Sequence, residues 1–317
     1  MQASDILAQA SVSEDPAEYV YRNKLRDVFF MLEGLSRIYM HVDEKDFFRT
    51  LRDVFKEIED EIGAVDYYDT FYRKYIDLPI FSKEILSYAK DQTTAHLQTL
   101  NVLLVKNEWL VNGGFISEIQ NDISELNLPG AKKIAHEIEE HYSETIAKII
   151  DFIDENAVPF TQLEDQVHEL RRRLRWLSIY AQATLGDFQY AEETANADSL
   201  AQYLTPEIVA SKFNVLPPNM SSDYVFLLRK NKFLALSWMI AELGKIKDEG
   251  LEVFLVQEAL MNTGSANEQE ALATAAKMLG KSDGFIATLL NRSTQITSAF
   301  MEERVLQQLF IGMKKND

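Results

Sequence analysis

Glycine and proline are scarce in this chain, and they stand mainly where turns are needed. The 317 residues include 12 glycines and 7 prolines. Elsewhere, apolar residues recur at the spacing of amphipathic helices, and no segment is convincing as a strand. The sequence therefore predicts an all-α protein. Long helices are expected over residues 17–35, 44–75, 80–106, 131–155, 161–184 and 285–313, and from residue 223 onward.

Helix start signals mark several of these segments. Asp15-Pro16-Ala17-Glu18 combines an N-cap residue, a proline at the first helical position and an acid in the first turn. Thr161–Glu164 and Ser265–Glu268 have the pattern of a capping box. Residues 1–16, which precede the first expected helix, are polar and are expected to form a flexible tail.

The most distinctive segment places four arginines and a histidine between His168 and Arg175. On a helix, a cationic row falls within an arc of about 100° and an apolar set falls on the opposite face. The row consists of His168, Arg171, Arg172 and Arg175, and the apolar set of Val167, Leu170, Leu174, Leu177 and Ala181. Guanidinium groups bind phosphate oxygens bidentately, so the exposed row suits a polyanion. Arg173 lies off the row and is expected at the surface or in an ion pair.

The overall charge limits which partners this row can serve. With 32 basic and 50 acidic residues, the chain has a net charge of −18. Its long-range field therefore excludes general binding of nucleic acids or membrane surfaces, and any polyanion site must be local. No apolar run approaches the roughly 18–20 residues that cross a bilayer, and no export leader is evident. Cysteine is absent, which fits a reducing compartment, and we expect a cytoplasmic protein.

The two halves of the chain resemble each other. Leu170–Leu177 aligns with Leu25–Leu32, and Leu243–Asp248 aligns with Ile62–Tyr67. The two motifs are 36 residues farther apart in the second half, and this difference equals the length of an acidic, polar segment at 187–222. We therefore expect two pseudo-repeated helical bundles of about four helices each. Their predicted bounds are 17–157 and 158–317, with 187–222 as an insertion in the second.

These residues resemble the conserved histidine α-helical domain (CHAD) family. In that family a histidine is followed by an arginine three residues later, by further basic residues, and then by a Leu-Gly turn, and the pattern occurs in both halves. His168, Arg171 and Arg175 match it in the second half, before Leu243-Gly244, and Arg26 matches it in the first half, before Ile62-Gly63. The resemblance implies two four-helix bundles that face each other across a basic groove, and binding of inorganic polyphosphate.

Several positions depart from the family pattern. Residues other than the expected histidine or basic residue occur at Asn23, Phe30, Glu33 and Asp66 in the first half, and at Trp176 and Ser178 in the second. The resemblance therefore implies that the second half keeps most of the cationic site, while the first half has lost much of its positive charge.

The predicted function is non-catalytic binding of inorganic polyphosphate or a similar phosphorylated polyanion. The candidate site residues are His168, Arg171, Arg172, Arg175, Arg26, Arg22 and Lys247. The alternative is a divergent helical scaffold that has lost this ligand and contacts other proteins. No enzyme, cofactor or metal site is expected. His136 and His141 are five residues apart rather than four, so they do not share the helix face that an HExxH zinc site requires.

Overall fold

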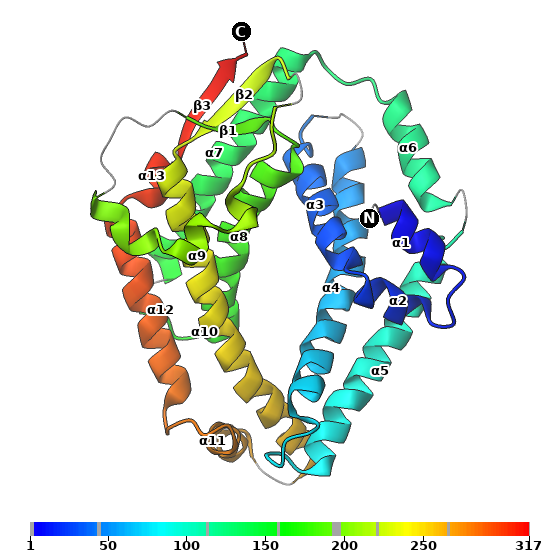
Figure 1. The fold of residues 1–317 in the computed structure, drawn as a ribbon, viewed down its shortest axis with the longest axis vertical. Helices are drawn as coiled ribbons and strands as arrows, with labels where there is room; N and C mark the ends of the chain where they lie inside the picture. The colour runs from blue at the N-terminus through cyan, green and yellow to red at the C-terminus, as the bar shows by residue number, and fades with distance from the viewer. Residues whose placement is uncertain are drawn as a thin grey trace. The chain divides into compact units, whose positions relative to one another are not determined.

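The computed structural model of the protein describes residues 3–42, 46–111, 114–156, 159–191, 198–219, 222–264 and 267–316 (Figure 1). Most of these residues are helical, which confirms the predicted all-α class. Three short strands, which the sequence analysis did not predict, form one small sheet in this part of the chain.

The chain divides into two compact units, and each unit joins segments that are distant in the sequence. The first unit contains Met1–Arg37, Asp43–Leu128 and Glu252–Asp283, and the second contains Ile38–Val42, Pro129–Leu251 and Gly284–Asp317. The predicted boundary between residues 157 and 158 lies inside the second unit. Helix α10 (Lys230–Thr263) begins in the second unit and ends in the first.

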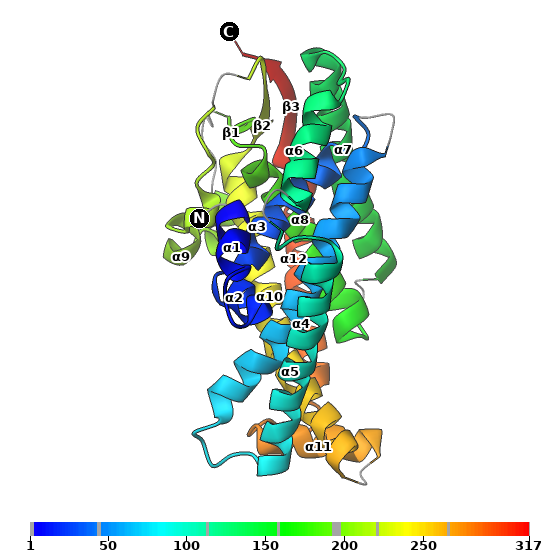
Figure 2. The same ribbon diagram turned by 90° about the vertical axis from the view of Figure 1, so that its right-hand side faces the viewer.

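The first unit is built around a long helical hairpin, α4 and α5, whose helices pack along each other (Figures 1 and 2). Its helices are α1 (Ala3–Ala10), α2 (Pro16–Arg22), α3 (Leu25–Ile38), α4 (Phe47–Tyr75), α5 (Lys83–Lys106), α6 (Phe115–Glu125) and α11 (Glu268–Met278). The rings of Phe29, Phe55 and Trp109 lie within 5.1 to 6.0 Å of one another in its core.

The beginning of the chain differs from the expected tail and single long helix. Residues 3–10 form α1, and its Ile6, Leu7 and Ala10 are buried in the core of the first unit. The helix expected over 17–35 is divided into α2 and α3, because Lys24 has a left-handed backbone with φ of 60°. The start signal is confirmed, since the Asp15 carboxylate accepts a hydrogen bond from the Glu18 amide at 3.0 Å.

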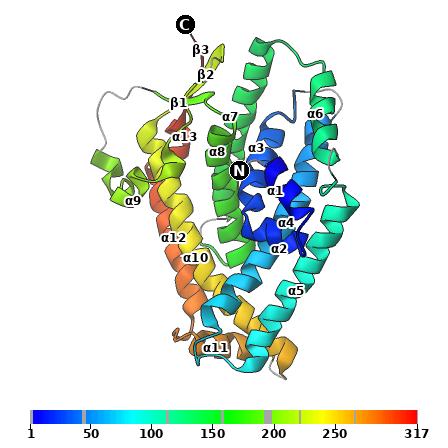
Figure 3. The same cartoon turned by 45° about the vertical axis from the view of Figure 1, so that its right-hand side comes forward.

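The second unit surrounds α7 (Ala131–Asn156) and α8 (Glu169–Ala183), which pack against each other and against the sheet (Figure 3). Its other helices are the π-helix η1 (Leu163–His168), the 3-10 helices η2 (Asp198–Tyr203) and η3 (Lys212–Asn214), α9 (Pro206–Val209), α10, α12 (Phe285–Glu302) and α13 (Val305–Leu309). Its strands are β1 (Phe188–Tyr190), β2 (Tyr224–Leu228) and β3 (Phe310–Lys315).

The strands correct two of the helix predictions. Residue 223 does not begin a helix, because 224–228 form β2, and the last long helix ends at Glu302 rather than at Met313. β2 pairs in parallel with β1 and antiparallel with β3. These partners are distant in the sequence, so short apolar runs that read as helix in isolation become strands when their backbone groups find each other.

Side chains cap two short helices in the second half of the chain. Thr205 caps α9, with its hydroxyl accepting from the Ile208 amide. The capping box predicted at Ser265–Glu268 includes two residues, 265 and 266, that lie outside the described part. The box that the structure shows is formed by Asn267 and Glu270 at the start of α11.

A substitution at Gly186, two residues before β1, can test the backbone geometry of the fold at this turn. Its φ is 109°, and a β-carbon there would lie 2.2 Å from the carbonyl oxygen of Pro218. We expect Gly186→Ala to lower the free energy of unfolding by about 2–4 kcal/mol, because both the backbone and a rigid neighbour must shift. Gly130→Ala is the control, since nothing lies within 4 Å of that position, and it should cost less than about 1 kcal/mol. Equal urea midpoints for the two variants would contradict this account.

Candidate functional site

The helix that carries the arginine row begins with an unusual π-helical turn. η1 continues directly into α8, and the side-chain oxygen of Gln166 accepts hydrogen bonds from the backbone amides of Thr161 at 2.7 Å and Gln162 at 3.0 Å. The capping box predicted at Thr161–Glu164 is therefore wrong: a glutamine from the next turn satisfies these amides. The predicted apolar face is confirmed, because its residues are fully buried: Val167, Leu170, Leu174, Leu177 and Ala181.

Three cations of η1 and α8 are paired with acids of the same helical segment. His168 Nδ1 lies 3.0 Å from Glu164 Oε2. Arg172 is 57% exposed and lies 2.5 Å from Glu169. Arg173, which was expected off the row, bonds to Glu169 at 2.7 Å and lies over the Phe152 ring, 4.4 Å from its centroid. Arg175 is half-buried on the same helix.

Arg171 lies against α10 at the Leu243-Gly244 motif of the second half. Its Nε donates a hydrogen bond to the carbonyl oxygen of Ile240 at 3.3 Å. A β-carbon on Gly244 would come within 2.9 Å of the same nitrogen. Gly244 therefore leaves the space in which the guanidinium group of Arg171 lies against the helix.

Arg26 makes the corresponding contact in the first unit. A β-carbon on Gly63 of α4 would come within 2.5 Å of its guanidinium nitrogen. Here, however, Arg26 Nε donates to Glu59 Oε1 at 2.6 Å, and Asp66 lies 3.6 Å away. Glu59 stands four residues before Gly63, as Ile240 stands four residues before Gly244. The arginine therefore donates to a carboxylate, that of Glu59, in the first unit and to a backbone carbonyl, that of Ile240, in the second.

Arg22 also belongs to a buried ionic network of the first unit. It lies 2.7 Å from Asp69 Oδ2, an atom that Tyr21 and Arg73 also contact at 2.8 and 2.9 Å. Burial raises the pKa of Asp69, but the hydrogen bonds from Arg22 and Tyr21 and the charge of Arg22 outweigh it and hold this pKa below its ordinary value. Arg22 is therefore a partner of a buried acid.

The remaining candidate, Lys247, lies on α10 and contacts Asp248 at 2.7 Å. Four of the seven predicted site residues thus share η1 and α8 in the second unit, and Lys247 belongs to that unit too. Arg22 and Arg26 lie in the first unit, where they contact buried carboxylates.

The sequence analysis noted Asp66 as a departure from the family pattern, but it did not predict that acids of α4 contact Arg22 and Arg26. Glu59, Asp66 and Asp69 follow one another on α4 at intervals of seven and three residues, and Gly63 lies between the first two. Residues at such intervals occupy one side of a helix. This spacing was a signal that the α4 surface beside Gly63 is acidic.

Comparisons with models of protein families, with curated proteins and with solved structures gave no match. Within the described ranges, no helix is long and apolar enough to span a membrane, and no group of three or more histidines and carboxylates is placed to hold a metal ion.

Arg26 and Arg172 should differ sharply in their effect on stability. Arg26→Ala leaves Glu59, which is only 6% exposed, without its closest cation, and we expect a loss of about 2 kcal/mol in the free energy of unfolding. Arg172→Ala removes an exposed pair and should cost less than about 0.5 kcal/mol. Urea unfolding at pH 7 measures both. If the two variants were equally stable, Arg26 would not have the structural role assigned to it.

The lowered pKa of Asp69 predicts that the stability of the fold depends on pH. Because its pKa is lower in the folded protein, its contribution is present above the unfolded-state pKa of about 4 and is lost as the pH falls through the folded-state value. We expect Asp69→Asn to be less stable than the wild type by about 1–3 kcal/mol at pH 7. The difference should shrink as the pH falls below about 4. A difference that stays constant over this range would show that the charge of Asp69 is not what stabilises the fold.

Proposed function

We propose that the protein binds inorganic polyphosphate or a similar phosphorylated polyanion, without catalysis, through the cationic face of η1 and α8. The observation that carries the proposal is the nature of the ion pairs on this face, where Arg172 is exposed and His168 is half-buried. Arg172 and His168 contact Glu169 and Glu164, acids three and four residues away on the same segment. Such surface pairs contribute roughly 0–1 kcal/mol each, so a ligand with many charges can replace them.

The crossing of Arg171 over Gly244 supports the same proposal. A guanidinium group held against a helix loses less conformational freedom when it binds phosphate than one extended into solvent. In the first unit, Glu59, one turn before Gly63, supplies a carboxylate to Arg26. The matching residue in the second unit is Ile240, one turn before Gly244, and its side chain is apolar. We infer that α8 supplies most of the affinity and that Arg22 and Arg26 add little.

We also propose that the two halves of the chain, 17–157 and 158–317, derive from a duplicated helical bundle, as the CHAD resemblance implies. Two arginine–glycine contacts support this idea, since Arg26 with Gly63 and Arg171 with Gly244 are the residues that the repeat aligns. The matching positions of Glu59 and Ile240 add a second correspondence.

The cytoplasmic location expected from the absence of cysteine stays a prediction.

Polyphosphate titration of the whole protein at two salt concentrations tests the function. We expect binding at about 20 mM salt that weakens by tenfold or more at about 200 mM, because phosphate binding releases counterions. Arg172→Ala/Arg175→Ala should weaken binding at low salt about tenfold or more, since two charge-assisted contacts are lost. Arg49→Ala/Arg52→Ala removes two arginines at the same spacing from α4 and is the matched control.

The control variant should bind like the wild type. Equal losses in both variants would show that only the net charge matters, and tight binding that ignores salt would contradict the ionic mechanism. Absence of binding at low salt would reject the proposal.

One observation favours the alternative, a scaffold for protein contacts. Several large apolar side chains of the second unit are exposed near the end of α8: Leu185, Val209, Phe213 and Val215. The amide of Gln182 on α8 donates to the carbonyls of Phe213 and Val215 at 2.9 and 3.1 Å, which holds this segment beside the helix. Exposed apolar residues that gather in this way are typical of protein interaction surfaces. If polyphosphate does not bind, this surface is the better candidate.

A further inference from the structure

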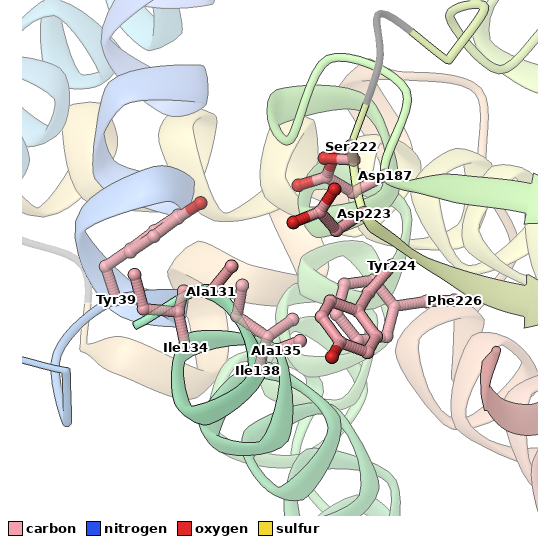
Figure 4. Close-up of a pocket in the computed structure, with 10 residues that line it drawn as sticks. All are labelled: Tyr39, Ala131, Ile134, Ala135, Ile138, Asp187, Ser222, Asp223, Tyr224 and Phe226. Atoms are coloured by element: carbon pink, nitrogen blue, oxygen red, sulfur yellow. The ribbon is translucent and has the colours of Figure 1, made fainter. Parts of the chain in front are cut away.

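A pocket in the second unit has an apolar floor and an acidic side (Figure 4). Ile134, Ala135 and Ile138 on the first turns of α7 form the floor, and the ring of Phe226 on β2 lies beside them. Asp187, Ser222 and Asp223 supply the opposite, polar side. The pocket is distinct from the cationic face of α8, and none of the residues proposed to bind polyphosphate lines it.

Backbone hydrogen bonds hold the two acids in place. The carbonyl of Asp187 accepts from the Phe226 amide at 2.8 Å, where β1 and β2 begin to pair. The carbonyl of Asp223 accepts from the Asn316 amide at 2.8 Å, and the Asn316 side chain donates to the carbonyl of Ser222 at 3.1 Å. The carboxylates are therefore presented by a fixed backbone at the edge of the sheet.

The polar groups of the pocket converge on one region. Asp187, Asp223 and Tyr39 all line this pocket, and in Figure 4 their oxygens face the space between α7 and the segments that carry the two acids. The Ser222 hydroxyl donates to Asp187. Burial and the nearby charge of Asp187 both raise the pKa of Tyr39 above its ordinary value, so the hydroxyl keeps its proton. Every polar side chain of the lining is an acid or a hydroxyl.

The charge in this pocket is not balanced by its own lining, because none of the ten residues that line it is basic. Burial raises the pKa of Asp187, and the hydrogen bond from Ser222 only partly opposes this effect. A cation that enters the pocket would favour the ionised carboxylate, whereas an anion would be repelled. The apolar floor, in turn, suits a hydrocarbon group better than the water shell of a metal ion.

We propose that this pocket binds a small primary amine with a short apolar chain. The ammonium group donates hydrogen bonds to the carboxylates of Asp187 and Asp223, and the Tyr39 hydroxyl is within the same polar region. The chain lies against Ile134, Ile138 and Phe226. An ammonium group has three donors and no acceptor, which matches a pocket side made of carboxylates and hydroxyls.

Saturation-transfer NMR with the whole protein tests this proposal, with n-butylamine as the probe. We expect transfer to n-butylamine, and little or none to butan-1-ol or butanoate at the same concentration. Asp187→Asn should weaken n-butylamine binding at least tenfold, because the amide carries no charge. Asp151→Asn is the matched control, since Asp151 is an exposed acid on α7 away from the pocket lining, and it should bind like the wild type.

A second variant separates loss of the site from loss of the fold. Ala131 lines the pocket and is itself exposed, so Ala131→Trp should obstruct the entrance, abolish n-butylamine binding and leave the melting temperature unchanged. Equal transfer to all three probes, or unchanged binding in Asp187→Asn, would overturn the proposal. Displacement of n-butylamine by equimolar Mg²⁺ would also overturn it, because the pocket would then hold a metal ion. Polyphosphate titration of the same variants keeps the two proposals distinguishable.

Discussion

In each unit, two helices approach each other where an arginine crosses a glycine. Arg26 of α3 lies over Gly63 of α4, and Arg171 of α8 lies over Gly244 of α10, with space for neither glycine to carry a β-carbon unless the arginine moves. A long side chain laid flat in this way covers apolar surface with its methylene groups while its guanidinium group stays near polar partners. On the same helices, Leu25 of α3 and Leu170 and Leu174 of α8 are fully buried.

The residue one turn before each glycine decides the chemistry of the contact. Glu59 gives Arg26 a buried carboxylate, and a buried carboxylate without a cation is costly, so this arginine is part of the fold. Ile240 gives Arg171 a backbone carbonyl instead. The same geometry therefore pairs the arginine with a buried acid in one unit and, in the other, places Arg171 next to the exposed Arg172. The buried pair of Glu33 with Arg37 follows the logic of the first case, at a position where the family resemblance implied a base.

Within the second unit, charged side chains form two local arrangements that differ from the net charge of the chain. On η1 and α8, four arginines follow Glu164, Asp165 and Glu169, and Arg172 and Arg173 form short-range pairs with Glu169. At the edge of the sheet, by contrast, Asp187 and Asp223 share a pocket whose lining offers no base. One local arrangement is therefore suited to an anion and the other to a cation, and the net charge of the whole chain indicates neither.

The sequence by itself determined the helical class, the start of α2 at Asp15-Pro16, the buried face of α8 and the cationic row on its other face. These features depend on residues within one or two helical turns, so local spacing is enough to specify them. The tertiary structure decided what depends on distant partners. Residues 224–228 form β2 because residues 188–190 and 310–315 pair with them. Arg22 and Arg26 contact acids of α4. Backbone hydrogen bonds at the sheet hold Asp187 and Asp223 at the same pocket. Local periodicity carries no information about which residues meet across such distances, and only the tertiary structure showed which acids Arg22 and Arg26 contact.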